Sequence, residues 1–448
     1  MLAAMSSLNS KQSMIIRTLI DSAPDGVIRN LDTALGSEHL DGAMAEIRDM
    51  VGAEAAERRT RGLVFHPLMG LCPKAPPRTP HKIFPARTPA LLWTALKAVD
   101  PDQTSLACAA AMSWTDDSDP PEVFDRLCAS AAEGLREPAG TPFAAAAVFL
   151  DEAEPNGAEL FASYLDLVPL ARTTIGKLPE WLARMTEERA VTIRLAFKDA
   201  TAVAVDAGPK FFEILCAQLA EPWQILRIIS AVMDRPGDSY MAASELGHIG
   251  ERLLIDIQRR MEVFAAFDPH SGAKAGEQAA EAVAGAVGLI AEFEQSVDLA
   301  KDGPWGTTIL KHKRNLAQQV EKLLAKADDA AAAALPLRSA RFGKGRGLPR
   351  FDNPPDLRAV ACAEGMMAFV NHVRGSAPAG GYASFRGKVI ERLDDRLDHY
   401  VEDVLDHLRG EESGDLDRAA EFLEIAAGLI GLLRDEKAAQ IVRRRAAA

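Results

Sequence analysis

Glu245 and His248 are the first candidates for metal chemistry, because they have the Glu-x-x-His spacing by which one helix offers two ligands to a di-iron site. At about 100° per residue, however, both point away from the apolar stripe that begins at Leu246. No second Glu-x-x-His pair occurs in the chain. A solvated helix face is therefore the favoured interpretation.

A second row of polar residues recurs every four positions near the C-terminal end and would share one helix face. The row consists of Asp395, His399, Asp403 and His407. It could hold a divalent ion or a charged partner, but it lies opposite the apolar stripe of the same segment and has further acidic neighbours. An acidic, solvent-facing surface is the favoured interpretation.

Three side chains of zinc-binding type occur in a proline-rich segment, His66, Cys72 and His81, but they lack the compact paired spacing of a structural zinc site. Cys72 has basic neighbours in sequence and is the one candidate for a reactive thiol. The five cysteines are odd in number and irregularly spaced, which favours packing roles in a reducing compartment. We predict no metal and no cofactor.

Two glycine-containing segments invite comparison with phosphate-binding loops. The segment 381–388 ends in Gly-Lys but has five residues between its glycines, and Val389 stands where a magnesium-binding hydroxyl should follow. A turn that opens the next helix is favoured there. Gly343, Gly345 and Gly347 alternate with cations and could wrap an anion with backbone amides.

Charge segregation is the strongest signal in this chain of 448 residues and net charge −13. No Asp or Glu occurs between Arg58 and Val99, whereas eight Lys or Arg do, and seven prolines between Pro67 and Pro89 preclude a continuous helix there. A basic, extended strap is predicted. Its neighbour must be negative, either the acidic remainder of the chain or an outside partner.

A second basic, helix-breaking segment lies at 335–355 and has no acid before Asp352. The two segments together supply the candidate anion-binding or partner-binding residues, which are Arg58, Arg59, Arg61, Lys74, Arg78, Lys82, Arg338, Arg341, Lys344, Arg346 and Arg350. No catalytic residue is predicted, because neither a nucleophile elbow nor an activated cysteine is present.

The elements that must position these residues are helices. Apolar residues recur at three- and four-residue spacing from Leu246 to Phe264 and from Ile390 to Leu408, and no strand-like alternation is found. Two strongly apolar segments, 279–293 and 422–433, are too short to span a membrane and are predicted to be buried helices. The fold class is therefore all-α.

Prolines divide the first half of the chain. Pro101, Pro120, Pro138 and Pro155 recur at 17 to 19 residues and predict starts of short helices, since proline is tolerated in a first helical turn. The predicted architecture is an irregular helical-hairpin array, with spacing in the range of helical repeats, followed by a bundle of longer helices. The expected regions are N-terminal helices at 1–60, the basic proline-rich strap at 61–88, the short-helix array at 89–236, a long-helix bundle at 237–334, the basic loop at 335–355, and C-terminal bundle helices at 356–448.

Composition and the absence of a secretion signal predict a cytoplasmic protein. The leading hypothesis is a non-enzymatic adaptor or regulator that binds a protein partner through the array and the basic loops. One alternative is an enzyme with a site between helices, in which arginines hold a phosphorylated or carboxylated substrate. Another is single-stranded nucleic-acid binding by the 338–351 loop, which the net negative charge disfavours. The sequence is also compatible with a homo-oligomer.

Overall fold

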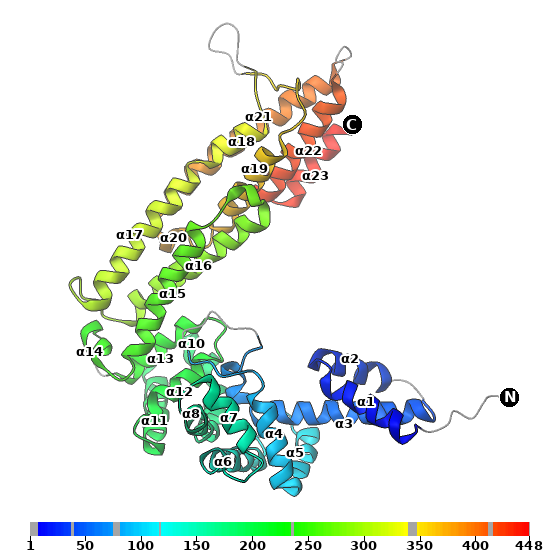
Figure 1. Cartoon of the computed structure of the whole chain (residues 1–448). Coiled ribbons are helices and arrows are strands. Elements are labelled where there is room, and N and C mark those ends of the chain that lie inside the picture. Colours follow the sequence, from blue (N-terminus) through cyan, green and yellow to red (C-terminus); the bar gives the residue numbers. More distant parts are fainter. Residues whose placement is uncertain are drawn as a thin grey trace, which may run out of the picture. The chain divides into compact units, whose positions relative to one another are not determined.

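A computed structural model describes residues 8–36, 40–74, 81–115, 118–233, 237–338, 347–410 and 415–447. Within these ranges the chain is helical and has no strand, only two isolated bridges, Gly237 to Asp298 and Leu337 to Pro349. The predicted all-α class is confirmed. Figure 1 shows the helices in chain order. The chain divides into two compact units, Met1–Val232 and Met233–Ala448.

The N-terminal unit begins with three helices and a short 3-10 turn, followed by an array of shorter helices. Its elements are α1 (Ser10–Ser22), α2 (Asp25–Gly36), α3 (Ala43–Val64), η1 (His66–Leu71), α4 (Thr88–Val99), α5 (Pro101–Ser113), α6 (Glu122–Arg136), α7 (Ala144–Ala153), α8 (Gly157–Leu165), α9 (Val168–Ile175), α10 (Leu178–Ala183), α11 (Glu187–Val203), α12 (Ala207–Cys216), η2 (Pro222–Gln224) and α13 (Ile225–Val232).

Two hydrophobic cores stabilise this unit. Ile20, Ile28 and Val51 form a small one where α1 and α2 lie on the first half of α3. The second half of α3 contacts α4, α5 and α6, which belong to the array. Because its 22 residues span about 33 Å, α3 connects the two cores.

The prolines act as expected at some helix starts and not at others. Pro101 is the first residue of α5, where the Asp100 side chain accepts a hydrogen bond from the Gln103 amide. Pro120 and Pro155 precede their helices by two residues. Pro138, in contrast, lies six residues before α7, because a turn between Pro138 and Thr141 intervenes. The helices pack as neighbours, but no regular repeat is established.

The C-terminal unit contains the long helices. Its elements are α14 (Asp238–Ala243), α15 (Gly247–Ala265), η3 (Pro269–Ser271), α16 (Ala273–Ser296), α17 (Pro304–Leu324), α18 (Ala327–Ala334), α19 (Leu357–His372), α20 (Ala377–Gly380), α21 (Ala383–Arg409), α22 (Leu416–Leu433) and α23 (Glu436–Ala446). The predicted stripes of α15 and α21 face the core, and the apolar segments of α16 and α22 are buried helices, as expected.

Close helix contacts in this unit depend on small residues. A Cβ atom at Gly276 of α16 would lie 2.1 Å from the carbonyl oxygen of Gly365 in α19, so glycine is required for these helices to approach. Phe264 of α15 stacks on Phe369 of α19 with ring centroids 5.6 Å apart. These contacts place α19 at the centre of the unit.

The start of α17 is built around a buried carboxylate. Asp238 is 2% exposed and accepts hydrogen bonds from the Gly306 amide, at 3.1 Å, and from the Ser239 hydroxyl. A negative charge at a helix N-terminus is stabilised by the unpaired amides of the first turn. Gly303 and Gly306 leave no room for a side chain, since a Cβ at Gly303 would lie 1.9 Å from the Asp238 carboxylate.

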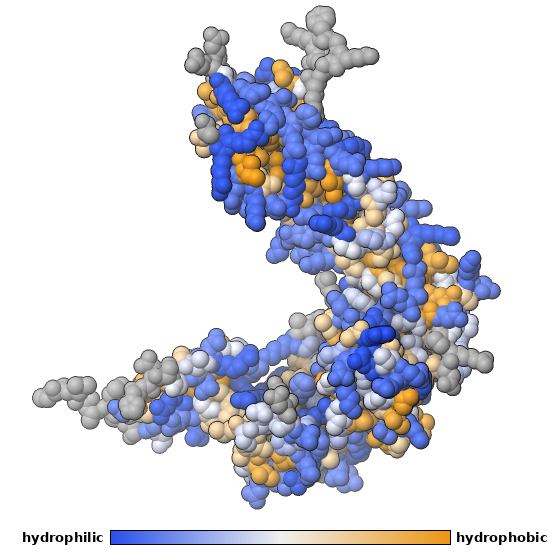
Figure 2. Space-filling view, turned by 180° about the vertical axis from the view of Figure 1, so that it is seen from behind, coloured by the Kyte–Doolittle hydropathy of each residue, from blue (hydrophilic) through white to orange (hydrophobic). Residues whose placement is uncertain are grey.

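On the face drawn in Figure 2, hydrophilic residues predominate and hydrophobic residues form separate patches. Among the described residues, no helix combines the length and apolar composition needed to span a bilayer.

Candidate functional site

Arg58 connects the three N-terminal helices. Its guanidinium donates to Glu54 within α3, to Asp25 at the start of α2, and to three backbone carbonyls at the end of α1, at 2.6 to 3.2 Å. The last carbonyls of a helix have no partner within the helix, and Arg58 supplies one. All five of its N–H groups are used and its side chain is 10% exposed, so Arg58 has a structural role here.

Asp25 collects the positive charges around Arg58. Its carboxylate accepts from Arg58 at 3.0 Å and from Lys74 at 2.7 Å, and Arg61 lies 3.8 Å away. The hydrogen bond from Lys74, together with the charges of Lys74, Arg58 and Arg61, holds the pKa of Asp25 below its ordinary value. Three of the predicted basic residues thus converge on one carboxylate of the same chain.

A pocket of about 720 Å³ opens beside this cluster and is called the arginine pocket below. It is lined by Asp25, Ile28, Arg29, Asp32, Gly52, Ala55, Ala56, Arg58, Arg59, Thr60, Arg61, Gly62, Met69, Ala111 and Met112, from α2, α3, η1 and α5. Its size is typical of ligand and peptide sites. Its four arginines outnumber its two aspartates, so the pocket favours an anionic occupant.

Two of these arginines are available for such an occupant. Within the described residues, Arg29 and Arg59 are exposed and make no ion pair. Met69 and Met112 also line the pocket and are 41% and 75% exposed. Flexible thioether side chains adapt to apolar groups of varied shape. The pocket therefore combines unpaired guanidinium groups with an adaptable apolar surface.

The remaining predicted residues lie elsewhere. Lys82 pairs with Glu154 at the end of α7. Arg338 and Arg350 both approach Asp352, at 2.6 and 4.0 Å, in the C-terminal unit. The predicted Arg78, Arg341, Lys344 and Arg346 lie outside the described residues.

Sequence reasoning missed Arg29, Met69 and Met112. Arg29 stands between two aspartates on α2 and outside the acid-free stretch, so charge counting did not single it out. Met69 lies in the proline-rich strap and Met112 in an alanine-rich segment, and neither position has a sequence pattern that indicates a binding site. Helical spacing of Arg29 from Asp25 and Asp32 was the one available signal.

The other candidates from the sequence are a reactive thiol, metal ligands and a glycine-rich turn. Burial raises the pKa of the Cys72 thiol to about 12, opposite to the lowering that a reactive cysteine needs. Among the described residues no three His, Cys, Asp or Glu side chains are placed to hold a metal ion. Gly381 adopts a left-handed conformation between α20 and α21, two residues before α21 begins, which confirms the predicted turn.

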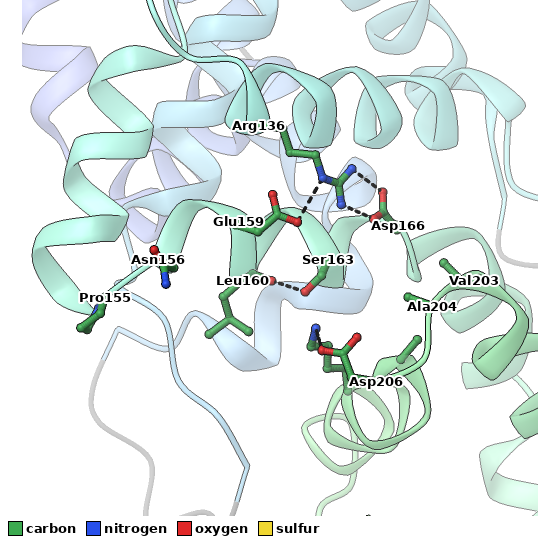
Figure 3. A pocket seen from close by; sticks show the side chains of 12 residues that line it. Arg136, Pro155, Asn156, Glu159, Leu160, Ser163, Asp166, Val203, Ala204 and Asp206 are labelled. Atoms are coloured by element: carbon green, nitrogen blue, oxygen red, sulfur yellow. Dashed lines mark hydrogen bonds and ion pairs between the residues drawn. The ribbon is translucent and has the colours of Figure 1, made fainter.

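A smaller pocket in the array shows a different balance of charge. It has a volume of about 380 Å³ and lies between α6, α8 and the turn from α11 to α12. Figure 3 shows Arg136 reaching to both Glu159 and Asp166 at its edge. Lys210 pairs with Asp206 at 2.6 Å. Its cations are therefore already neutralised.

No protein-family model, curated protein or solved structure matches the chain.

Proposed function

We propose that the protein is a non-enzymatic adaptor or regulator that binds an acidic segment of a protein partner in the arginine pocket. One observation carries the proposal: Arg29 and Arg59, which are unpaired within the described residues, line the same pocket as the exposed Met69 and Met112. Arginine and methionine are both enriched in protein interfaces.

The chemistry of the pocket selects the kind of partner. Guanidinium groups bind carboxylates through paired, charge-assisted hydrogen bonds, whereas the methionines need an apolar group. A peptide segment that presents Glu or Asp beside Leu or Phe meets both needs. Asp25 and Asp32 in the lining disfavour a polyanion of uniform charge, such as a nucleic acid.

Peptide binding tests the proposal directly. Fluorescence anisotropy would compare a labelled amphipathic peptide of Glu and Leu with the same peptide carrying Lys in place of Glu, and with a labelled single-stranded oligonucleotide. We expect saturable binding of the acidic peptide only, weakening as salt rises, because the contacts are electrostatic. Equal binding of the basic peptide, or tighter binding of the oligonucleotide, would overturn the proposal.

Matched variants locate the binding site. The double variant Arg29→Ala/Arg59→Ala should weaken acidic-peptide binding about tenfold or more, since charged hydrogen bonds contribute about 1.5–3 kcal/mol each. Arg48→Ala removes a half-exposed arginine of α3 about three turns before Arg59 and should leave affinity unchanged. If both variants lose affinity equally, the effect comes from general charge and not from the pocket.

A further inference from the structure

Helix α17 carries a row of polar side chains on the side opposite the core. Lys311, Arg314, Gln318 and Lys322 recur at three- and four-residue spacing, and Asn315 lies beside them. At about 100° per residue, these five side chains occupy an arc of about 100° around the helix. They are called the α17 row below. The buried residues of the helix lie on the other side and are Trp305, Gly306, Ile309, Leu316, Val320 and Leu324.

The α17 row is exposed and its cations are unpaired. All five residues of the row are exposed, and Lys311, Arg314 and Lys322 make no ion pair within the described residues. Lys313, in contrast, lies on the side of the helix that faces α16 and pairs with Glu294 of α16 at 2.7 Å. The protein thus neutralises the cation that faces inward and leaves those of the row without a counter-charge. Figure 1 shows α17 along one edge of the C-terminal unit.

No acid belongs to the α17 row. The one acid of α17 is Glu321, which is half-buried and lies about 10 Å along the helix from Arg314. Burial, and after it the charge of Lys311, holds the pKa of His312 below its ordinary value, so His312 stays neutral near neutral pH. The net positive charge of this face therefore comes from the lysines and the arginine alone.

The α17 row offers charge and hydrogen bonds but no apolar anchor. None of the exposed large hydrophobic residues of the described chain lies on α17. Stable attachment to a membrane needs an apolar anchor beside the charges, and single-stranded nucleic acid needs aromatic rings on which its bases stack. Asn315 accepts a hydrogen bond from Gln319 at 2.9 Å, which leaves its amide N–H groups to donate. The row is therefore suited to a partner that presents carboxylates.

Spacing selects the form of that partner. Successive members of the α17 row stand about 4.5 or 6 Å apart along the axis, and Lys311 and Lys322 are about 16 Å apart. An acidic helix that lies antiparallel to α17 presents carboxylates at the same intervals when Glu recurs at i, i+4, i+8 and i+11. A DNA duplex carries its phosphates more densely, and the net charge of −13 repels such a polyanion.

We propose that the exposed face of α17 binds an acidic helix of a protein partner. The partner's carboxylates pair with Lys311, Arg314 and Lys322 and accept a hydrogen bond from the amide of Gln318. This surface lies in the C-terminal unit and does not depend on the arginine pocket, which lies in the N-terminal unit. The two sites can therefore be tested separately.

Patterned peptides test the spacing. Two labelled, alanine-rich peptides of about twenty residues would have the same composition, with four Glu on one helix face in the first and spread around the helix in the second. Their helicity is matched by circular dichroism. Fluorescence anisotropy uses the full chain with Arg29→Ala/Arg59→Ala, which removes the contribution of the arginine pocket. We expect the patterned peptide to bind about tenfold tighter, because several exposed ion pairs form together.

Matched variants locate the surface. Lys311→Gln/Lys322→Gln should weaken binding of the patterned peptide about tenfold and leave the thermal unfolding midpoint unchanged, because both side chains are exposed and unpaired. Lys274→Gln/Lys437→Gln removes two exposed lysines from α16 and α23 and should have no effect. Equal affinity of the two peptides, equal losses in the two double variants, or tighter binding of a DNA duplex would overturn the proposal. None of these outcomes bears on the arginine pocket, since that pocket is already disabled.

Discussion

The two basic stretches of this chain pair with carboxylates from different places in the sequence. In the first, Arg58, Arg61 and Lys74 meet Asp25, and Lys82 meets Glu154, so the counter-charges come from helices far away in sequence. In the second, the described cations Arg338 and Arg350 share Asp352, a close neighbour in sequence.

Burial separates the two regions further. The Arg58 side chain is 10% exposed, whereas those of Arg338 and Arg350 are 54% and 44% exposed. An exposed pair is screened by solvent and contributes little, whereas a buried charge must be satisfied on every side. Two basic stretches of the sequence therefore lead to a helix junction in one region and to surface ion pairs in the other.

The largest expected effect comes from Arg58→Ala. The change removes five hydrogen bonds, to carbonyls at the end of α1 and to the carboxylates of Glu54 and Asp25, which should cost about 3 kcal/mol in local stability. Hydrogen exchange of amides in residues 10–36 measures this, and protection should fall about a hundredfold. Arg48→Ala is the control, and unchanged protection in Arg58→Ala would refute the junction role.

Lys82→Gln should have a smaller effect. Lys82 and Glu154 are 25% and 36% exposed, so losing the pair should cost about 0.5–1 kcal/mol. A double-mutant cycle with Glu154→Gln isolates the interaction, with amide exchange in α7 as the readout. A coupling energy of zero would mean that charge pairing does not secure the strap.

Acid should loosen the first region through Asp25. Its pKa is lowered in the folded state, so its contribution to stability is complete above the ordinary pKa of 3.8 and disappears as the pH falls through the lower folded value. The loss should stay below about 1 kcal/mol, because the side chain is 38% exposed and screened. Carboxyl-carbon NMR titration measures the pKa, and Lys74→Met should raise it. A pKa at or above 3.8 would contradict the prediction.

The smallest effect is expected from Arg338→Ala. Its partner Asp352 is also largely exposed, so the stability of the C-terminal unit should change by less than about 0.5 kcal/mol. Urea unfolding of this variant beside Arg350→Ala checks the expectation. If Arg338→Ala lowers stability as much as Arg58→Ala does, the exposed ion pairs of the second stretch matter as much as the buried junction, which contradicts the comparison.

The sequence was sufficient to predict the fold class because helical periodicity is a local property. The stripes from Leu246 and along 390–408 depend only on spacing within one helix, and both face a core. The position of Asp25 relative to Lys74, 49 residues later, depends on how three helices meet. No local sequence pattern predicts how these helices pack.

The arginine pocket was predictable in part for the same reason. The sequence identifies Arg58, Arg59 and Arg61 as a run of positive charges. It does not show that Arg58 is fully hydrogen-bonded inside the protein whereas Arg59 is exposed. That difference follows from whether the side chain points toward the end of α1 or toward solvent. Met112 enters the pocket only because α5 packs on α3.

The buried Asp238 has a practical consequence for dividing the chain. It follows closely on the boundary at Val232, and its partners in α17 and the bridge from Gly237 to Asp298 all lie on the C-terminal side. A fragment of residues 233–448 therefore retains these described contacts of Asp238 and of the bridge at Gly237. Expression of this half alone should give a folded product, whereas a fragment starting at Ser239 would lose the carboxylate that holds the start of α17 and should be markedly less stable.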